Sequence, residues 1–415
     1  MKVAFWIIAF LAVYTYLGYG LLVWALVKIR HRLGKGRTAP NWRTTYLPEV
    51  TLVVPAYNEM SCLADKLANS LSLDYPADKL HLLFVAEGST DGSIEYLKAQ
   101  QEKYPNLAIM GGNERLGKIE AMNQAMKKIQ TPLVIYSDAN TILNREAIRN
   151  TVRHFQDPEV AAVAGEKRIL TESNEAAAGA GEGLYWKYES FLKRLDTELH
   201  TVVGAAGEFF AMRTALYESV EYDTLLDDFM ISLRLAGRGY RVVYEPEAYA
   251  MERPSFSVME EQKRKVRIAA GGFQSIVRLT DLLNPFKHGW LTFQYVSHRA
   301  MRWAVTPFCL PILVVLNALI AVVDGGWFWW LLLVGQLGFY GAAYAGYRLE
   351  SRQIRRKALF VPFYFTFMNV CVLLGYQRYR RGGHNGIWEK AKRADNLPNA
   401  SQAGPGQTPV LESVP

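Results

Sequence analysis

The chain has 415 residues, which is enough for two to three domains of about 150 residues each. Half of the residues are hydrophobic and 21% are charged, so the composition excludes an intrinsically disordered chain. The net charge of +8 suits nucleic acid, an anionic bilayer or an anionic substrate. Three widely separated cysteines argue against a disulfide framework and against a cysteine-rich metal site.

An uncharged run near the N-terminus, residues 3–27, exceeds the roughly 20 residues that a helix needs to cross a bilayer. A cleaved signal peptide has a shorter apolar run and ends in small residues. Here a basic cluster follows, which consists of Lys28, Arg30, Arg32, Lys35 and Arg37. Because positive charge collects on the cytoplasmic side, we expect a transmembrane helix over residues 1–30 with its N-terminus outside the cell.

Three more uncharged runs, 304–323, 325–347 and 358–377, lack the polar stripe of a soluble helix. They predict a C-terminal transmembrane region over residues 304–377 with two to three spans. Asp324 alone separates the first two runs, which suits an external turn. Arginines follow the last run on the side that a full crossing would place outside, so the topology of this end stays open.

Two other segments near the C-terminus differ from these runs. Residues 281–303 mix aromatic and basic side chains, which is typical of a helix lying on the membrane surface, although an ordinary connecting helix fits equally well. Residues 395–415 are rich in Pro, Gly and Ser and predict a disordered tail.

Between residues 50 and 165, short apolar runs alternate with helical stretches. The runs read VTLVVPA, LHLLFVA, LAIM, PLVIYSD and VAAVAG. This alternation predicts an α/β fold with a mostly parallel sheet that is covered on both faces. In such sheets ligands bind beyond the carboxyl ends of the strands.

Polar and acidic residues follow three of these runs. They are Tyr57, Asn58 and Glu59; Glu87, Ser89 and Asp91; and Ser137, Asp138 and Asn140. Each group alone is also typical of a turn, but three groups at one edge favour a site. Carboxylates at a phosphate-binding edge need a cation between them and the ligand, and hard oxygen ligands suit Mg²⁺ or Mn²⁺. We therefore predict a nucleoside diphosphate held through a divalent cation.

A near match to the phosphate-binding loop of nucleotide hydrolases lies at Gly112-x4-Gly117-Lys118. Ile119 stands where that loop needs a hydroxyl group for its magnesium, so we reject a nucleotide hydrolase. Lys118 nevertheless begins a predicted helix beside the acidic edge and can meet a phosphate as a point charge.

Farther along, a Gly- and Ala-rich stretch at 176–183 predicts a loop before an aromatic amphipathic helix. The spacing of Leu225, Phe229 and Leu233 then predicts another helix, with Asp227 and Asp228 on its first turn. The helix dipole favours ionised carboxylates there. Both aspartates could simply cap the helix, but two adjacent acids after a Gly-rich loop favour a general base.

With these residues in view, the chain resembles the membrane-bound family 2 glycosyltransferases of the cellulose synthase-like group. The likeness is greatest to a bacterial branch that carries a Ser-Asp-Ala-Asn motif, here residues 137–140, and a Ser-His-x-x-x-Arg-Trp motif, here residues 297–303. It covers roughly residues 48–303. The resemblance implies a cytoplasmic nucleotide-sugar-binding domain of the GT-A type over residues 48–280, at the bacterial inner membrane, that inverts the anomeric carbon in one displacement.

The resemblance also implies roles for single residues. Tyr57, Glu59, Glu87 and Asp91 would hold uridine, Lys118 and Arg267 would lie near the diphosphate, Asp138 and Asn140 would bind Mg²⁺ or Mn²⁺, Asp228 beside Asp227 would be the general base, and Gly207 and Arg264 would contact the acceptor. Glu87 stands where the family usually has Asp. The Gln-x-x-Arg-Trp signature of processive synthases appears as Arg264-x-x-Arg267-Ile268, without the aromatic platform for an acceptor sugar.

We therefore expect an inverting hexosyltransferase that uses a nucleoside diphosphate sugar, UDP-linked by the resemblance, to extend a polysaccharide or other cell-surface glycan. Two alternatives remain: single transfer to a lipid such as polyprenyl phosphate, and a non-catalytic nucleotide-sugar-binding subunit of a synthase, which the presence of Asp228 disfavours. The expected partners are the donor, a glycan or lipid-linked acceptor, membrane lipids and, because the spans are few, export subunits. Nucleic acid is not expected, because the excess positive charge flanks the spans.

Overall fold

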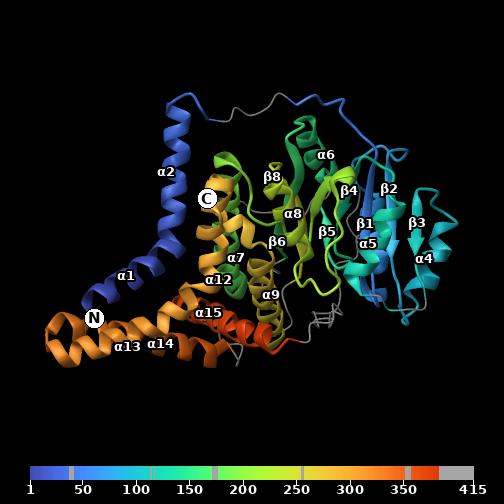
Figure 1. Ribbon diagram of the computed structural model, residues 1–415. Coiled ribbons are helices and arrows are strands. Elements are labelled where there is room, and N and C mark those ends of the chain that lie inside the picture. The colour runs from blue at the N-terminus through green and yellow to red at the C-terminus, as the bar shows by residue number, and fades with distance from the viewer. Residues whose placement is uncertain are drawn as a thin grey trace.

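The structure is a computed structural model. It describes residues 1–36, 42–112, 115, 117–170, 176–253, 257–350 and 357–382. An α/β domain forms one part of the molecule, and long helices lie along one side and across one end of it (Figure 1). The disordered tail predicted at 395–415 lies outside the described residues.

Among the described residues the α/β domain is built on a sheet of eight strands in the order β3-β2-β1-β4-β7-β6-β8-β5. The strands are β1 (Val50–Pro55), β2 (Leu80–Val85), β3 (Leu107–Met110), β4 (Leu133–Tyr136), β5 (Ile142–Leu143), β6 (Val160–Ile169), β7 (Phe210–Arg213) and β8 (Arg241–Glu252). Strands β3, β2, β1 and β4 are parallel, as are β6 and β8. Strand β7 is antiparallel to both neighbours, and β5 is antiparallel to β8. The prediction of a mostly parallel sheet is confirmed.

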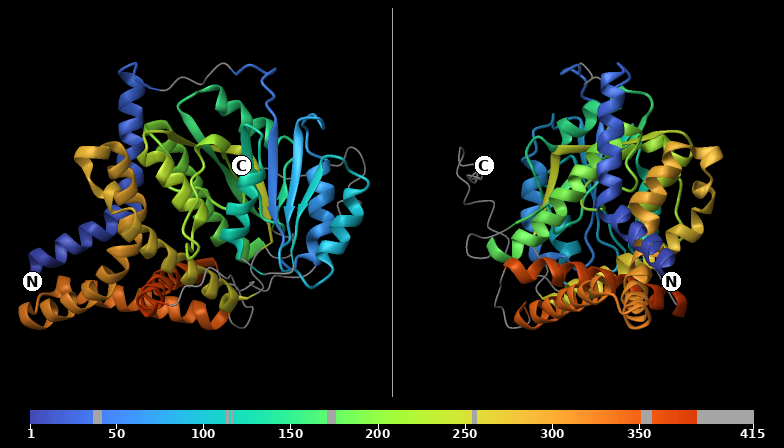
Figure 2. Two further views of the ribbon diagram at one scale, coloured as in Figure 1. Left: turned by 45° about the vertical axis from the view of Figure 1, so that its right-hand side comes forward. Right: turned by 90° about the vertical axis from the view of Figure 1, so that its left-hand side faces the viewer.

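Helices cover both faces of this sheet (Figures 1 and 2). The helices of the first part of the domain are α3 (Met60–Leu71), α4 (Ser93–Gln101), α5 (Lys118–Lys128) and α6 (Ala147–Val152), and α8 (Asp227–Gly237) follows β7. Leu63, Leu97 and Ile148 belong to one buried cluster, and Met122 and Met230 belong to a second. Burial of these apolar side chains is the main force that holds the layers together.

The antiparallel strand β7 decides which loops meet. Tyr136 at the end of β4 lies opposite Phe210 at the start of β7. The segment leaving β4 and the segment entering β7 therefore reach the same edge of the sheet, next to the end of β1. This edge is the one at which the sequence predicts the polar residues to gather.

Helix α7 (Ala176–Leu199) corrects one prediction. The stretch 176–183 forms the beginning of this helix, so the predicted loop is wrong. Alanine has the highest helix propensity, and it offsets the glycines in this stretch. Farther along, α7 packs closely against the N-terminal helix: a Cβ atom at Gly20 would lie 3.0 Å from the Tyr188 hydroxyl and 3.1 Å from Leu192.

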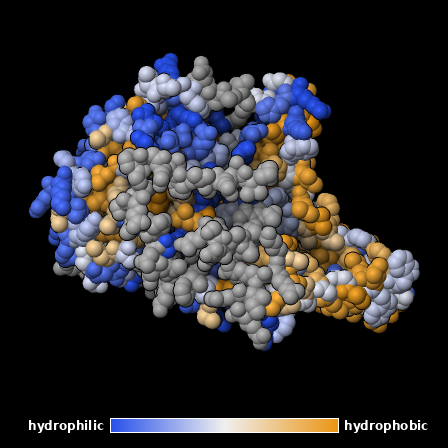
Figure 3. Space-filling view, turned by 180° about the vertical axis from the view of Figure 1, so that it is seen from behind, coloured by the Kyte–Doolittle hydropathy of each residue, from blue (hydrophilic) through white to orange (hydrophobic). Residues whose placement is uncertain are grey.

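The N-terminal run forms α1 (Lys2–Val13), a π-helical turn (Tyr14–Gly18) and α2 (Tyr19–Arg32). The π turn marks the bend between α1 and α2 in Figure 1. By length and composition, three helical stretches among the described residues could cross a membrane: Lys2–Arg32, Thr306–Asp324 and Ala358–Arg381. Orange surface concentrates on the arm that projects from the α/β domain in Figure 3, where exposed apolar side chains face outward.

The C-terminal helices are α13 (Thr306–Asp324), α14 (Trp327–Glu350) and α15 (Lys357–Arg381). They correspond to the three predicted apolar runs, and α14 is a long helix but not one of the candidate spans. Lys2 forms an ion pair with Asp324, so the N-terminus and the turn between α13 and α14 lie together. The sequence predicts both on the outer side of the membrane.

The segment 281–303 is a broken helix rather than a continuous one. It contains α10 (Pro285–His288), α11 (Trp290–Gln294), a π-helical segment (Tyr295–Ala300) and α12 (Met301–Ala304). Tyr295 and His298 are fully buried, whereas Phe286 is fully exposed. The later part of the segment thus packs against the protein, and Phe286 in the earlier part is open to its surroundings.

Candidate active site

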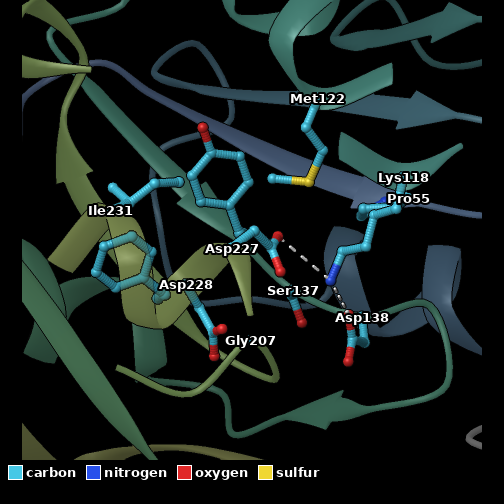
Figure 4. A pocket seen from close by; sticks show the side chains of 11 residues that line it. Pro55, Lys118, Met122, Ser137, Asp138, Gly207, Asp227, Asp228 and Ile231 are labelled. Carbon is cyan, nitrogen blue, oxygen red and sulfur yellow. Dashed lines mark hydrogen bonds and ion pairs between the residues drawn. The ribbon is translucent and has the colours of Figure 1, made fainter. Parts of the chain in front are cut away.

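One pocket at this edge of the sheet brings together residues predicted for the donor side and the acceptor side (Figure 4). Its lining consists of Pro55, Lys118, Met122, Tyr136, Ser137, Asp138, Gly207, Phe210, Asp227, Asp228 and Ile231. The acidic and basic groups come from three separate parts of the chain. Their meeting is therefore a property of the fold and not of sequence proximity.

Local structure accounts for the position of each charged group. Asp138 lies two residues beyond β4, and Lys118 is the first residue of α5. Gly117 precedes it with a φ of 84°, in the left-handed region that favours glycine, and so allows the chain to turn into the helix at the edge. Asp227 and Asp228 occupy the first turn of α8, as predicted.

Lys118 is the cation at the centre of the pocket. Its Nζ atom lies 3.4 Å from Asp138 Oδ1 and 3.7 Å from Asp227 Oδ2. Burial lowers the pKa of Lys118, but Asp138, Asp227 and Asp228 together more than offset burial and raise it above its ordinary value. Lys118 therefore stays protonated and neutralises part of the acidic charge.

Asp228 has the electrostatic properties of a general base. Burial, and then the neighbouring Asp227 carboxylate, raise the pKa of Asp228 to about 7, although Lys118 opposes the rise. A base works best when its pKa lies near the operating pH. A Cβ atom at Gly207 would lie 3.5 Å from Asp228 Oδ2, so the glycine leaves space directly in front of this carboxylate.

The two predicted arginines lie on α9 (Val258–Arg278). Burial and the nearby Arg264 lower the pKa of Arg267. The three pocket carboxylates, Asp227, Asp138 and Asp228, act in the opposite direction, so Arg267 is close enough to the pocket to interact electrostatically with its acidic groups.

Arg264 lies 3.8 Å from Glu208 and 3.7 Å from Glu252. Both glutamates also pair with the fully buried Lys167. Glu208 follows Gly207, so Arg264 belongs to an ion cluster beside the pocket. Its predicted contact with the acceptor stays a prediction.

The residues predicted to hold uridine gather beyond β1 and β2 and are not part of the pocket lining. The guanidinium of Arg115 lies 4.2 Å from the centre of the Tyr57 ring. Glu59 accepts a hydrogen bond from the Cys62 thiol at 3.3 Å. In Glu87, the Oε2 atom is buried without a hydrogen-bond partner among the described residues, and burial raises the pKa of this carboxyl.

Asp91 has a visible structural role. One carboxylate oxygen accepts a hydrogen bond from the Met60 amide at 2.9 Å, and the other accepts from the amide and hydroxyl of Ser93. These bonds lower the pKa of Asp91 against the opposing effect of burial. Asp91 thus joins the beginnings of α3 and α4. Its predicted contact with uridine would come in addition to this structural role.

The residues around Asp138 fit a cation that is shared with a substrate. Among the described residues, no group of three or more His, Cys, Asp and Glu side chains is arranged to hold a metal ion. The two predicted ligands, Asp138 and Asn140, both lie in the segment after β4. Magnesium sites of this kind use one or two carboxylates and complete the coordination with substrate phosphates and water.

Sequence reasoning missed two buried lysines near the site. Lys66 is fully buried, and it falls on the apolar face of α3 with Leu63 and Leu67. A lysine on such a face is the signal that could have identified it. Lys167 lies in β6, where no sequence pattern distinguishes it from an exposed lysine.

Comparison with known proteins agrees with this geometry. Residues 48–271 match the family described as "Glycosyltransferase like family 2". The chain is 28% identical over 276 residues to the poly-beta-1,6-N-acetyl-D-glucosamine synthase of Staphylococcus aureus (strain COL). The matched region covers 65% of this chain and 64% of that protein. The enzyme of the same name from Staphylococcus epidermidis is 25% identical over 240 residues, with 55% and 56% covered. The chain thus matches less than two thirds of the length of these curated relatives.

Among solved structures, the chain is similar to the mannosyltransferase PcManGT from Pyrobaculum calidifontis in complex with GDP-Man and Mn²⁺. The TM-score is 0.68 at 24% sequence identity, with 91% of this chain and 99% of that chain covered. The prediction of a GT-A type α/β fold with apolar helices at both ends is confirmed.

Proposed function

This chain belongs to glycosyltransferase family 2, and we propose from its pocket that it transfers a sugar from a nucleoside diphosphate sugar to a hydroxyl acceptor with inversion of the anomeric carbon. The observation that carries the proposal is that Asp138, Lys118 and Asp228 line one pocket. A donor-side carboxylate, a cation for phosphate and a base with a pKa near neutral then act on the same sugar.

In the proposed reaction Asp228 takes the proton from the acceptor hydroxyl. The acceptor oxygen forms a bond to the anomeric carbon while the bond from that carbon to the diphosphate oxygen breaks. The attack comes from the face opposite the leaving group, so the configuration inverts and no covalent enzyme intermediate is needed. Gly207 leaves room for the acceptor hydroxyl in front of Asp228.

Lys118 and Arg267 are the protein cations that stabilise the departing diphosphate. Asp138 and Asn140 would hold Mg²⁺ or Mn²⁺, which supplies further positive charge to the phosphate oxygens. Asp227 is 3.7 Å from Lys118 and adds negative charge beside Asp228. Its part in the reaction is therefore to keep Lys118 protonated and to keep Asp228 basic.

The nucleotide would extend beyond this pocket. The residues predicted to hold uridine are absent from the pocket lining, and the empty space of about 290 Å³ in the pocket includes the part that is open to solvent. We propose that the sugar and diphosphate occupy this pocket and that uridine lies toward Tyr57, Glu59, Glu87 and Asp91. The buried Glu87 Oε2 then has a polar group to meet.

The acceptor is proposed to be a growing polysaccharide at the bacterial inner membrane. The relatives named as poly-beta-1,6-N-acetyl-D-glucosamine synthases support this choice and make UDP-N-acetylglucosamine the first donor to test. In this proposal the α/β domain, residues 48–280, faces the cytoplasm, residues 281–303 lie at the interface, the chain crosses the membrane several times, and export subunits complete the pathway. The Ser137–Asn140 motif supports membership of the cellulose synthase-like group.

A single transfer to a lipid acceptor is the second candidate. Ile268 stands where processive synthases carry the tryptophan of their signature motif. The length of the product on a gel separates the two: a ladder or a high-molecular-weight smear supports a polysaccharide, and one extra sugar on a lipid supports single transfer.

The direct test uses the full chain in detergent with a panel of UDP- and GDP-linked sugars, with and without Mn²⁺. We expect release of the nucleoside diphosphate that depends on one donor sugar and on the cation. Asp228→Asn is expected to abolish release while nucleotide binding is retained. Full activity of this variant would refute the assignment of the base. If neither the wild type nor the variant binds nucleotide, the proposed function is refuted.

A further inference from the structure

Lys66 is a fully buried lysine whose ammonium group reaches the segment that carries Asp138. Its Nζ atom donates to Ser137 Oγ at 2.7 Å, to the Thr141 carbonyl oxygen at 3.0 Å and to Thr141 Oγ1 at 3.3 Å. An ammonium group has three donors, and all three are directed at residues on either side of Asp138. Burial of a charge is unfavourable unless its hydrogen bonds are satisfied, so a fully buried lysine in this position indicates a specific role.

The three bonds fix a compact turn. Thr141 Oγ1 donates to the Asp138 carbonyl oxygen at 2.8 Å, which closes the turn from Asp138 to Thr141. One helical turn after Lys66, Asn69 exchanges two hydrogen bonds with the backbone of Leu143, at 2.8 and 2.9 Å. Helix α3 therefore holds the segment 137–143 at both ends through side chains on one face.

The same contacts reach the acceptor side of the pocket. Ser137 Oγ accepts from Lys66 and donates to the Glu208 carbonyl oxygen at 3.2 Å. Glu208 follows Gly207, which leaves the space in front of Asp228. A chain of two hydrogen bonds thus joins α3, the Asp138 segment and the segment that enters β7.

We propose that Lys66 is a positioning residue that holds the Asp138 segment in the shape required to bind a divalent cation with a nucleoside diphosphate, and that it never touches the substrate itself. This inference rests on the proposed function for the identity of the ligand. Lys66 has no exposed surface and its donors are used, so it acts through Ser137 and Thr141.

Charge and position have opposite consequences for a cation, which makes the proposal testable. Lys66 is positive and close to Asp138, so removal of its charge alone would strengthen the binding of Mn²⁺. Loss of the three hydrogen bonds would loosen the segment and weaken binding. Removal of a residue that orients a metal ligand typically costs about 10–100-fold in metal affinity.

The test compares the full chain in detergent with Lys66→Met, which has a similar length and no donor. Ser70→Ala is the matched control, because Ser70 is equally buried on α3 and, among the described residues, its hydroxyl donates only to the Lys66 carbonyl oxygen of the same helix. Binding of Mn²⁺ is measured with UDP present. We expect about 10–100-fold weaker Mn²⁺ binding in Lys66→Met and little change in Ser70→Ala. Equal or tighter binding in Lys66→Met overturns the proposal.

Hydrogen–deuterium exchange supplies a readout that needs no ligand. In Lys66→Met we expect faster exchange confined to residues 137–143 and the segment before β7. Unchanged exchange there overturns the proposal whatever the enzyme does. If the wild type binds neither Mn²⁺ nor UDP, the proposed function fails, and the exchange experiment still decides the role of Lys66.

A milder variant covers the case in which Lys66→Met does not fold. Thr141→Val keeps the shape of the side chain and removes the hydroxyl that bonds to Lys66 and to Asp138. The expected change is in the same direction and smaller. With donor and Mn²⁺ saturating, turnover by either variant should approach that of the wild type, because positioning affects cation affinity more than the chemical step. Unrecovered turnover with unchanged Mn²⁺ affinity contradicts the proposal.

Discussion

Replacement of Asp228 by Asn should abolish transfer and at the same time stabilise the folded protein at alkaline pH. A buried carboxylate that must ionise for catalysis is unfavourable for the fold. The folded-state pKa of Asp228 is about 7, raised by burial and by Asp227 from an ordinary value of 3.8. A neutral amide of the same size avoids this unfavourable ionisation.

The pKa shift fixes both the sign and the size of the effect. Below pH 4, Asp228 is protonated in the folded and unfolded chains, so it has no effect on the pH dependence of stability. Between pH 4 and 7, Asp228 ionises in the unfolded chain but not in the folded chain, so rising pH favours unfolding. Above pH 7, Asp228 is ionised in both states and the loss of stability is complete. A shift of about 3 units corresponds to about 4 kcal/mol. Because the side chain is partly open to water in the pocket, we expect about 1–3 kcal/mol.

The assay is thermal unfolding of the full chain in detergent at pH 5 and pH 8. We expect the melting temperature of Asp228→Asn to exceed that of the wild type by about 3–8 °C at pH 8, with a much smaller difference at pH 5. Asp223→Asn is the control variant, and its melting temperature should lie below that of the wild type, because Asp223 accepts two hydrogen bonds from Arg278, at 2.7 and 2.8 Å. A difference that is independent of pH, or a lower melting temperature for Asp228→Asn at pH 8, would refute the reasoning.

Three further predictions concern the same pocket. In Lys118→Met, loss of the cation that lowers the pKa of Asp228 should move the acidic limb of the pH–activity profile to higher pH and weaken UDP binding; an unmoved limb contradicts the electrostatic coupling. Gly207→Ala should fold, since its Cβ atom would lie at ordinary contact distances of 3.5 Å from Asp228 and 3.7 Å from Lys118, but it should raise the acceptor KM, measured by initial rates. Chelation with EDTA should stop transfer, and Mn²⁺ should restore it; unchanged rates in EDTA would remove the cation from the proposal.

Local patterns predicted most of the elements that carry the site. Alternating apolar runs identify β1, β2, β3 and β4, and helical spacing identifies α8 with Asp227 and Asp228 on its first turn. These features depend on residues close together in the chain. The position of Asp138 beyond β4 follows in the same way, because it requires only the end of one strand.

Contacts between distant segments could not be predicted. Strand β7 inserts antiparallel between β4 and β6, and only this pairing brings Gly207 to the edge that carries Asp138. The pairing of Lys66 with Ser137 and the pairing of Lys167 with Glu208 likewise depend on segments that are far apart in sequence. Composition gives no information on such pairs, since it counts a lysine in the same way whichever residue the lysine contacts.

The N-terminal candidate span is joined to the α/β domain by a buried polar network. The Tyr19 hydroxyl of α2 donates to Asp196 of α7, and the other carboxylate oxygen of Asp196 lies 2.7 Å from His298 Nδ1. His298 Nε2 lies 3.3 Å from Glu189, which also pairs with Arg299 at 2.6 Å. Each of these groups would be costly to leave unpaired in the interior. Helices α2 and α7 and the π-helical segment Tyr295–Ala300 therefore form one rigid support.

This support continues to the acceptor side of the pocket. Arg299 Nε donates to the Val203 carbonyl oxygen at 2.9 Å, and Val203 begins the segment that leads through Gly207 into β7. The donor side is held by α3 through Lys66 and Asn69, which lies within the α/β domain. The two halves of the pocket thus have different main supports, one inside the domain and one anchored on a candidate membrane span, and the bond from Ser137 to Glu208 links them. Under the proposed function, an acceptor that reaches the pocket from the membrane would meet the half whose position the candidate membrane spans determine.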